Sequence, residues 1–245
     1  MENKFLRHEK LYNYNIIEKK KFFDNQILKL INFHKKNSKI YKKILNSMQL
    51  KPVKKLNDIP PIPITFFKKY ELLSIKKSKV LKTLSSSGTT SSNKSKVFLD
   101  AENSQNQTWV LSKIMEKIFG KKRLPMLIIE KEPKFNNFNR NDFNARIAAI
   151  NGFSIFASKK FFIFDENNKI KEKELIKFLK KYCKNKFIIF GFTDQIFNCF
   201  FKNKLKKKYS NFLKNGILVH GGGWKKLESK KIDNHLFKKK IQSNY

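Results

Sequence analysis

The spacing of the apolar residues changes along this chain and predicts its elements. Between residues 8 and 48 the apolar positions recur at helical spacing, and Ser38 stands where it can cap the last helical group. Residues 58–68 are punctuated by proline, whose ring forbids a regular helix and favours an extended connection. The pattern therefore predicts a helical opening followed by an extended connector.

Beyond the connector, short apolar runs alternate with amphipathic stretches. The predicted strands cover residues 79–84, 124–130, 161–164, 187–191 and 216–220, and the predicted helices cover residues 144–152, 171–183 and 194–201. Such alternation favours an α/β fold, a doubly wound sheet with buried, mostly parallel strands. Because ligands of these sheets bind beyond the carboxyl ends of the strands, the segments that follow strands are the first candidates for a site.

A hydroxyl-rich loop follows the first predicted strand. The six residues from Ser85 to Thr90 contain five hydroxyl side chains and one glycine, Gly88. Backbone N–H groups of such a loop can converge on one anion, and Lys94 follows with positive charge. This composition fits a phosphate-binding loop, but it is equally typical of a flexible linker. It is not a Walker loop, because the Gly-Lys-Ser/Thr sequence is missing.

A glycine motif ends the last predicted strand. Gly221, Gly222 and Gly223 follow His220 directly and precede Trp224. A backbone without side chains can pass close to a flat ligand such as an adenine ring, and Trp224 would cover that pocket. The glycines are also compatible with an ordinary turn that binds nothing. We expect His220 to be hydrogen-bonded within the protein rather than to bind a ligand.

The chain is strongly basic. Its 245 residues contain 55 Lys and Arg against 19 Asp and Glu, which gives a formal net charge of +36. Only four of the basic residues are arginine, the residue that phosphate and base recognition recruits, and the lysines are spread over the whole length. We therefore expect no nucleic-acid partner, and the lysines are interpreted as solvated faces.

Cysteine content and hydropathy narrow the class of protein further. The hydrophobic fraction of 40% is enough for a sizeable core. Two cysteines, Cys183 and Cys199, are too few for a disulfide framework, and no Cys/His spacing resembles a zinc site, so both are expected to be buried structural thiols and no metal ligands are assigned. No apolar run is long enough to span a membrane and the N-terminus lacks an apolar signal core, so a cytoplasmic protein is expected.

The two motifs together resemble those of the adenylate-forming superfamily. Ser-Ser-Gly-Thr-Thr at residues 86–90, with lysine shortly after, resembles its phosphate-binding loop, and its second landmark is a glycine pair after a strand that lines the adenine pocket. Two departures lie beside the loop, because Ser91 stands where the superfamily commonly has glycine and Asn93 where it commonly has proline. The loop is therefore expected to be stiffer or less well shaped.

More narrowly, the chain resembles the acyl-protein synthetase family, the LuxE-like long-chain-fatty-acid–protein ligases of the bacterial luminescence fatty acid reductase. The resemblance covers about residues 58 to 230, and its most specific element is His-Gly-Gly-Gly-Trp-Lys at residues 220–225. The matching segments occur in the family's order, at residues 59–63, 67–68, 72–74, 86–90, 190–193 and 220–226.

The resemblance implies an enzyme that activates a carboxylic acid in two steps. ATP and a long-chain fatty acid would give an acyl-adenylate and pyrophosphate, and a protein thiol would then take the acyl group. The residues that would hold the ATP phosphates are Ser86, Ser87, Gly88, Thr89, Thr90 and Lys94, and those at the adenine are Gly221, Gly222, Gly223 and Trp224. Mg²⁺ would bridge the phosphates, and an acyl-reductase subunit is the implied partner.

The resemblance also implies a domain plan. Residues 1–57 would form a helical segment that packs on an adenylate-forming core at residues 58–230, and residues 231–245 would be a truncated, Lys-rich end. In the family a Tyr-Gly motif, an acidic residue of the metal site, a small lid domain and the acyl-accepting cysteine come later, and none is recognisable after Leu227. We therefore expect a truncated chain with weak or no activity alone, in which no catalytic residue can be named.

Three alternatives stay open at this point. The first is an acyl-CoA ligase of the phenylacetate type, in which coenzyme A replaces the protein thiol. The second is a non-catalytic basic module that binds nucleic acid or another polyanion through its lysines, with an affinity that falls steeply with salt. The third is a decayed gene product that folds poorly.

Overall fold

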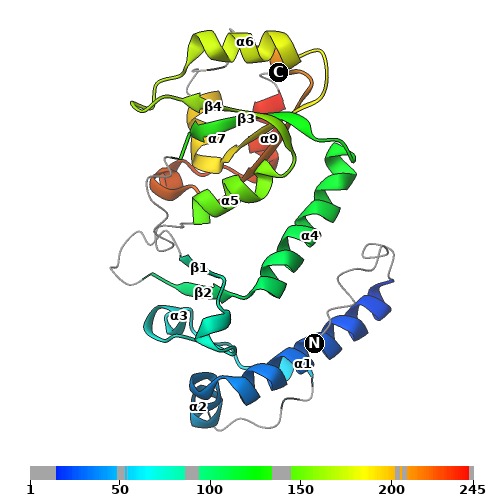
Figure 1. The fold of residues 1–245 in the computed structure, drawn as a ribbon, viewed down its shortest axis with the longest axis vertical. Coiled ribbons are helices and arrows are strands. Elements are labelled where there is room, and N and C mark those ends of the chain that lie inside the picture. Colours follow the sequence, from blue (N-terminus) through cyan, green and yellow to red (C-terminus); the bar gives the residue numbers. More distant parts are fainter. Residues whose placement is uncertain are drawn as a thin grey trace. The chain divides into compact units, whose positions relative to one another are not determined.

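The chain forms two compact units in a computed structural model (Figure 1). The structure describes residues 15–48, 53, 55–85, 94–133, 145–201, 205 and 209–242. Unit 1 comprises Met1–Met115 and Phe138–Ala148, and unit 2 comprises Glu116–Asn137 and Ala149–Tyr245. The division falls within two helices, α4 (Ala101–Phe119) and α5 (Ala145–Ser154).

Unit 1 begins with the predicted helices. They are α1 (Ile16–Asn37) and α2 (Lys39–Ser47), with Ser38 between them. The backbone N–H of Tyr41 donates to Ser38 Oγ at 3.3 Å, and Ser38 is 3% exposed. A hydroxyl acceptor at this position satisfies a donor that the first helical turn leaves open. The prediction of a helical opening with a cap at Ser38 is confirmed for residues 16–47, and residues 8–14 of the predicted opening lie outside the described residues.

The connector is extended only in its proline-rich part. Residues 60–63 have no regular structure, as predicted, but the helical turn α3 (Phe66–Lys69) follows closely. Proline lacks a backbone N–H donor but keeps its carbonyl acceptor. The carbonyl oxygen of Pro63 accepts a hydrogen bond from the N–H of Phe66 at 3.0 Å. The expectation of an extended connector over the whole of residues 58–68 is therefore wrong at both ends, since the 3-10 turn η2 (Leu56–Asp58) also reaches into it.

A two-stranded antiparallel hairpin also belongs to unit 1. Strand β1 (Lys82–Ser85) starts later than predicted, and the first predicted position, Lys79, belongs to the 3-10 turn η3 (Lys77–Lys79). Its partner β2 (Lys96–Leu99) was not predicted, and the register pairs Ser85 with Lys96. The hydroxyl-rich segment thus connects the paired ends of two strands, as expected of a loop between regular elements.

Unit 2 is built on a four-stranded parallel sheet with the strand order β4-β3-β5-β6. The strands are β3 (Leu124–Lys131), β4 (Ala157–Phe164), β5 (Phe187–Phe192) and β6 (Gly216–Gly221), and the helices are α6 (Glu172–Tyr182), α7 (Thr193–Phe201), α8 (Ser210–Leu213) and α9 (Asn234–Gln242), with a 3-10 segment η5 (Lys225–Lys230). Each strand of this sheet lies where an apolar run predicted one. The prediction of an α/β fold with a parallel sheet is confirmed in this unit.

Helices cover both faces of the sheet. Phe153 of α5 stacks on Phe190 of β5, with the ring centroids 4.5 Å apart. The neighbouring Ile189 belongs instead to the core cluster that includes residues of α6 and α7. Because successive side chains of a strand point to opposite faces, α5 lies on one face and α6 and α7 lie on the other. Strand β5 is accordingly buried along its whole length.

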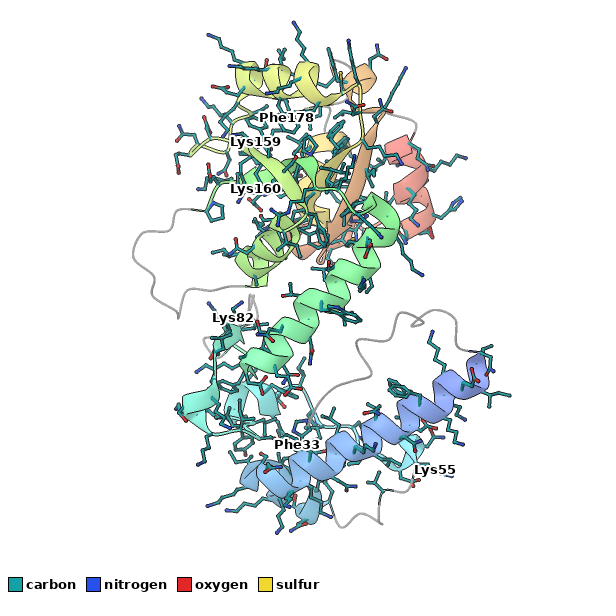
Figure 2. All side chains as sticks on the ribbon, turned by 45° about the vertical axis from the view of Figure 1, so that its right-hand side comes forward. Phe33, Lys55, Lys82, Lys159, Lys160 and Phe178 are labelled. Carbon is teal, nitrogen blue, oxygen red and sulfur yellow. The ribbon has the colours of Figure 1, made fainter. Side chains whose placement is uncertain are left out.

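The edge strand β4 separates the core from solvent. Figure 2 shows Phe178 on the sheet side of α6, where its ring stacks on Phe161 of β4 with the centroids 5.6 Å apart. Lys159 and Lys160 are exposed on the same strand. Lysines on an edge strand discourage pairing with another chain, which is consistent with the interpretation of lysines as solvated faces.

Candidate functional site

The carboxyl ends of β5 and β6 lie side by side in unit 2. Their last register pairs are Gly191 with His220 and Phe192 with Gly221. After β3 the chain adds β4 on one side of this strand, and after β4 it crosses back to add β5 on the other side. In open parallel sheets ligands bind at the carboxyl edge near this reversal. The glycine motif therefore stands at the edge where a ligand is expected.

Thr193 joins the two strand ends through its hydroxyl group. Thr193 Oγ1 lies 2.9 Å from the carbonyl oxygen of Gly222, 3.2 Å from that of Gly221 and 3.1 Å from Nδ1 of His220. The side chain is 6% exposed. Carbonyl oxygens only accept, so the single hydroxyl proton is directed to them and His220 donates through Nδ1–H. We name these four residues, Thr193, His220, Gly221 and Gly222, the threonine latch.

The environment keeps the imidazole of His220 neutral. Burial lowers the pKa of His220 below its usual value of 6.5, and the positive charge of Lys238 lowers this pKa further. The ring also lies against Phe237, with the centroids 4.9 Å apart. The expectation that His220 is hydrogen-bonded within the protein is confirmed.

The glycines present an exposed backbone at this edge. No heavy atom of the described residues lies within 4 Å of where a Cβ of Gly221 or Gly223 would stand, apart from chain neighbours. Gly222 has φ +82°, in the left-handed region that favours glycine, and its Cβ would lie 3.4 Å from Phe192 Cδ1. A flat ligand can therefore approach the main chain of Gly221 and Gly223 without meeting a side chain of the turn itself.

Trp224 is part of the hydrophobic core. Trp224 is 9% exposed, and the centroid of its ring lies 5.2 Å from that of Phe197 and 5.7 Å from that of Phe237. These contacts fix the residue that follows the glycines. The contact of Trp224 with an adenine ring stays a prediction.

The predicted phosphate loop is placed only through its flanks. Residues 86–90 lie outside the described residues, whereas Lys94 is exposed two residues before β2 begins. Ser85, directly before the loop, pairs with Lys96. The strands thus hold both flanks of the segment together in unit 1, and its binding of phosphate stays a prediction.

Comparison with known proteins decides which family carries these features. The family model described as acyl-protein synthetase, LuxE, matches residues 6–245. The chain belongs to the acyl-protein synthetase (LuxE) family. The match confirms the resemblance and also includes the helical opening, which the motifs did not cover. A search of the curated proteins found no match.

The sequence of this acyl-protein synthetase predicted two buried structural thiols and no metal ligands. Cys199 is buried, as predicted. Cys183 is only partly buried, so the prediction of a buried thiol is wrong for Cys183. The described part of the chain contains no group of three or more His, Cys, Asp or Glu residues placed to hold a metal ion. The same part contains no helix both long and apolar enough to cross a membrane.

The role of Thr193 was missed by reasoning from the sequence. This threonine was noted only as the end of a segment that resembles the acyl-protein synthetases. A usable signal existed, since a hydroxyl residue directly after a fully apolar strand lies at the carboxyl edge of a parallel sheet. What the sequence did not supply was the order of strands, which makes β6 the neighbour of β5.

Proposed function

We propose that this chain activates a long-chain fatty acid with ATP and transfers the acyl group to a protein thiol. Membership of the family implies acyl-protein synthetase activity through an acyl-adenylate, and therefore the use of ATP. The choice of a long-chain acid, an acyl-reductase subunit as partner and the cytoplasm as location are parts of the proposal. The proposal also treats the α/β core, residues 58–230, as the nucleotide-binding domain of an adenylate-forming enzyme.

The reaction has two balanced steps. A carboxylate oxygen of the fatty acid attacks the α-phosphorus of ATP, the bond to the β-phosphate oxygen breaks, and acyl-AMP and pyrophosphate result. A thiolate then attacks the acyl carbon, AMP leaves, and a thioester forms. The first step needs positioned charge more than it needs a reactive side chain.

Residue roles follow from this chemistry. Ser86, Ser87, Thr89 and Thr90, with the backbone of Gly88, would bind the β- and γ-phosphates, and Lys94 would add positive charge. Mg²⁺ would enter with ATP and neutralise phosphate charge. One or two protein carboxylates would suffice to hold it beside the phosphates, so the absence of a three-residue cluster among the described residues does not conflict with it.

One observation carries the adenine half of the proposal. The turn at Gly221–Gly223 is exposed on its ligand side and anchored beneath by buried groups, Thr193 at one end and Trp224 at the other. A site of this kind combines close approach with a fixed backbone.

The substitution Gly221→Ala tests the adenine assignment. The added methyl group meets no described atom of the protein, so the melting temperature is expected to stay unchanged. An adenine ring packed on this backbone would meet it, and we expect the KM for ATP to rise about tenfold, which corresponds to about 1.4 kcal/mol. The measurement is ATP–pyrophosphate exchange with a series of fatty acids, and the KM for the fatty acid serves as the control.

The possible results separate site from activity. An unchanged KM for ATP would place the adenine away from the turn. Because weak or no turnover of the chain alone is expected from the sequence, the proposed function would be refuted by absence of exchange with every fatty acid together with no rise in melting temperature on addition of ATP at physiological salt. Adding coenzyme A or an acceptor protein and analysing the thioester product distinguishes the proposed ligase from an acyl-CoA ligase, and the family assignment favours the protein acceptor.

A further inference from the structure

We propose that Thr193 is a positioning residue for ATP, whose hydroxyl group holds the glycine turn in its binding shape before the nucleotide arrives. This inference rests on the proposed function, because it assigns a role within the ATP site. It concerns Thr193 of α7, which lies beneath the turn and is separate from the glycines that would face the adenine.

The hydroxyl of Thr193 serves the turn rather than its own helix. A threonine that starts a helix commonly caps that helix by accepting an N–H from the first turn. Thr193 instead reaches residues 27, 28 and 29 positions away, at the end of β6. The described hydrogen bonds of this side chain thus tie one strand end to another.

Two successive carbonyl groups are directed to the same buried hydroxyl. The oxygens of Gly221 and Gly222 lie 3.2 Å and 2.9 Å from Thr193 Oγ1. Each carbonyl group lies in the plane of one peptide unit, so holding both oxygens fixes the orientation of two successive peptide units. The other side of the main chain then faces solvent. Glycine loses more conformational freedom on ordering than any other residue, and each backbone costs about 1–2 kcal/mol to fix. The latch places this cost in folding instead of in nucleotide binding.

Within the latch, His220 orients the hydroxyl group of Thr193. Its Nδ1–H donates to Thr193 Oγ1 at 3.1 Å, which orients the hydroxyl so that its own proton points to the carbonyls. A buried hydroxyl with a donor and an acceptor partner is satisfied and rigid. At the far end, the core contacts of Trp224 keep the chain from moving as a whole. The turn is therefore restrained at both ends while its ligand side stays open.

The test compares two substitutions at Thr193. Thr193→Val keeps the shape and removes the hydroxyl, whereas Thr193→Ser keeps the hydroxyl. We expect the valine variant to raise the KM for ATP about tenfold, with kcat and the KM for the fatty acid within about twofold of wild type. The serine variant is expected to return the KM for ATP to within about threefold of wild type.

A second readout does not depend on activity. In the ligand-free chain, hydrogen exchange of the amides in a peptide that covers residues 219–225 is expected to be faster in the valine variant and restored in the serine variant. The matched control is Thr108→Val, because Thr108 is exposed on α4 and its hydroxyl donates only to Ser104 O of the same helix, at 3.1 Å. This variant is expected to leave both readouts unchanged.

Three results would overturn the proposal. The first is a valine variant with wild-type KM for ATP and wild-type amide exchange. The second is a serine variant as impaired as the valine variant, since the hydroxyl would then not be the cause. The third is an equal loss for ATP and fatty acid together with a lower melting temperature in both variants, which indicates a merely structural residue. If the wild-type chain shows neither ATP–pyrophosphate exchange nor a rise in melting temperature with ATP, the proposed function fails, and unchanged amide exchange in the valine variant would separately refute the latch.

Discussion

His34 of unit 1 is a partly buried histidine whose surroundings affect its protonation. Its Nδ1 lies 2.7 Å from Ser74 Oγ, and its ring contacts Phe33 and Tyr41 edge-on. Burial lowers the pKa of His34 below its usual value of 6.5. The folded chain therefore prefers the neutral imidazole, and the hydrogen bond ties the end of α1 to the segment after α3.

The pH dependence of stability follows from this pKa. As the pH falls below 6.5, His34 binds a proton in the unfolded chain but stays neutral in the folded chain, because its pKa is lower there. The contribution of His34 to the free energy of unfolding is therefore complete above pH 6.5 and decreases below it. We expect His34→Gln to flatten the decrease, measured by urea unfolding between about pH 7.5 and 5.5. The slope that remains would come from His220, whose pKa is lowered as well. An equally flat curve from the exposed control His235→Gln would contradict the assignment.

Sequence reasoning at this scale succeeded where a residue acts on its neighbours in the chain. The cap at Ser38 was predictable because its partner, Tyr41, is three residues away. The partners of Thr193 were not, because they lie 27 to 29 residues away and become neighbours only through strand order. The buried position of Trp224 was missed for the same reason, since its ring contacts come from α7 and α9.

At the scale of elements, strand β5 has little room for a side chain at Gly191. A Cβ added to Gly191 would lie 2.7 Å from Ile196 Cδ1 and 3.0 Å from Ile129 Cβ. We expect Gly191→Ala to lower the free energy of unfolding by about 1–3 kcal/mol, because the strand is buried on both faces and cannot move outward. Urea unfolding gives the value.

A double variant shows whether crowding is the cause. Ile196→Val removes the closest atom, Cδ1, and leaves the contact with Ile129 Cβ. Gly191→Ala combined with Ile196→Val is therefore expected to be more stable than the sum of the two single effects. Simple additivity would instead attribute the loss to the backbone of the strand.

Elements were predictable in proportion to the clarity of their apolar pattern. The central strands β3 and β5 contain continuous apolar runs because helices cover both faces of the sheet. Helix α4 was not predicted, since its first seven residues, 101–107, are polar apart from Ala101 and mostly exposed, and therefore show no apolar face. Strand β2 was not predicted either, as Lys96 and Val97 are exposed and only Leu99 is buried.

At the scale of the whole molecule, the extent of the two units cannot be predicted by reading along the sequence. Each compact unit takes in two separate stretches of chain, so its extent follows from contacts rather than from composition. The formal net charge of the chain is +36, and the exposed ion pairs Lys77–Glu71 at 3.3 Å and Lys231–Glu228 at 3.1 Å each contribute little to stability. Any polyanion will therefore be attracted, and binding of ATP alone does not demonstrate a site.

Tripolyphosphate separates a nucleotide site from general attraction to the lysines, because it carries phosphate charge without adenosine. Both anions are expected to raise the melting temperature at low salt, since each neutralises part of the excess positive charge. At physiological salt the Debye length is about 8 Å, and attraction to scattered lysines is largely screened. We then expect the shift with tripolyphosphate to fall to a small fraction of its low-salt value, while ATP keeps most of its shift through adenine contacts at the glycine turn. Thermal unfolding with each anion at both salt concentrations measures this, and parallel loss of the two shifts would favour a polyanion-binding surface over an ATP site.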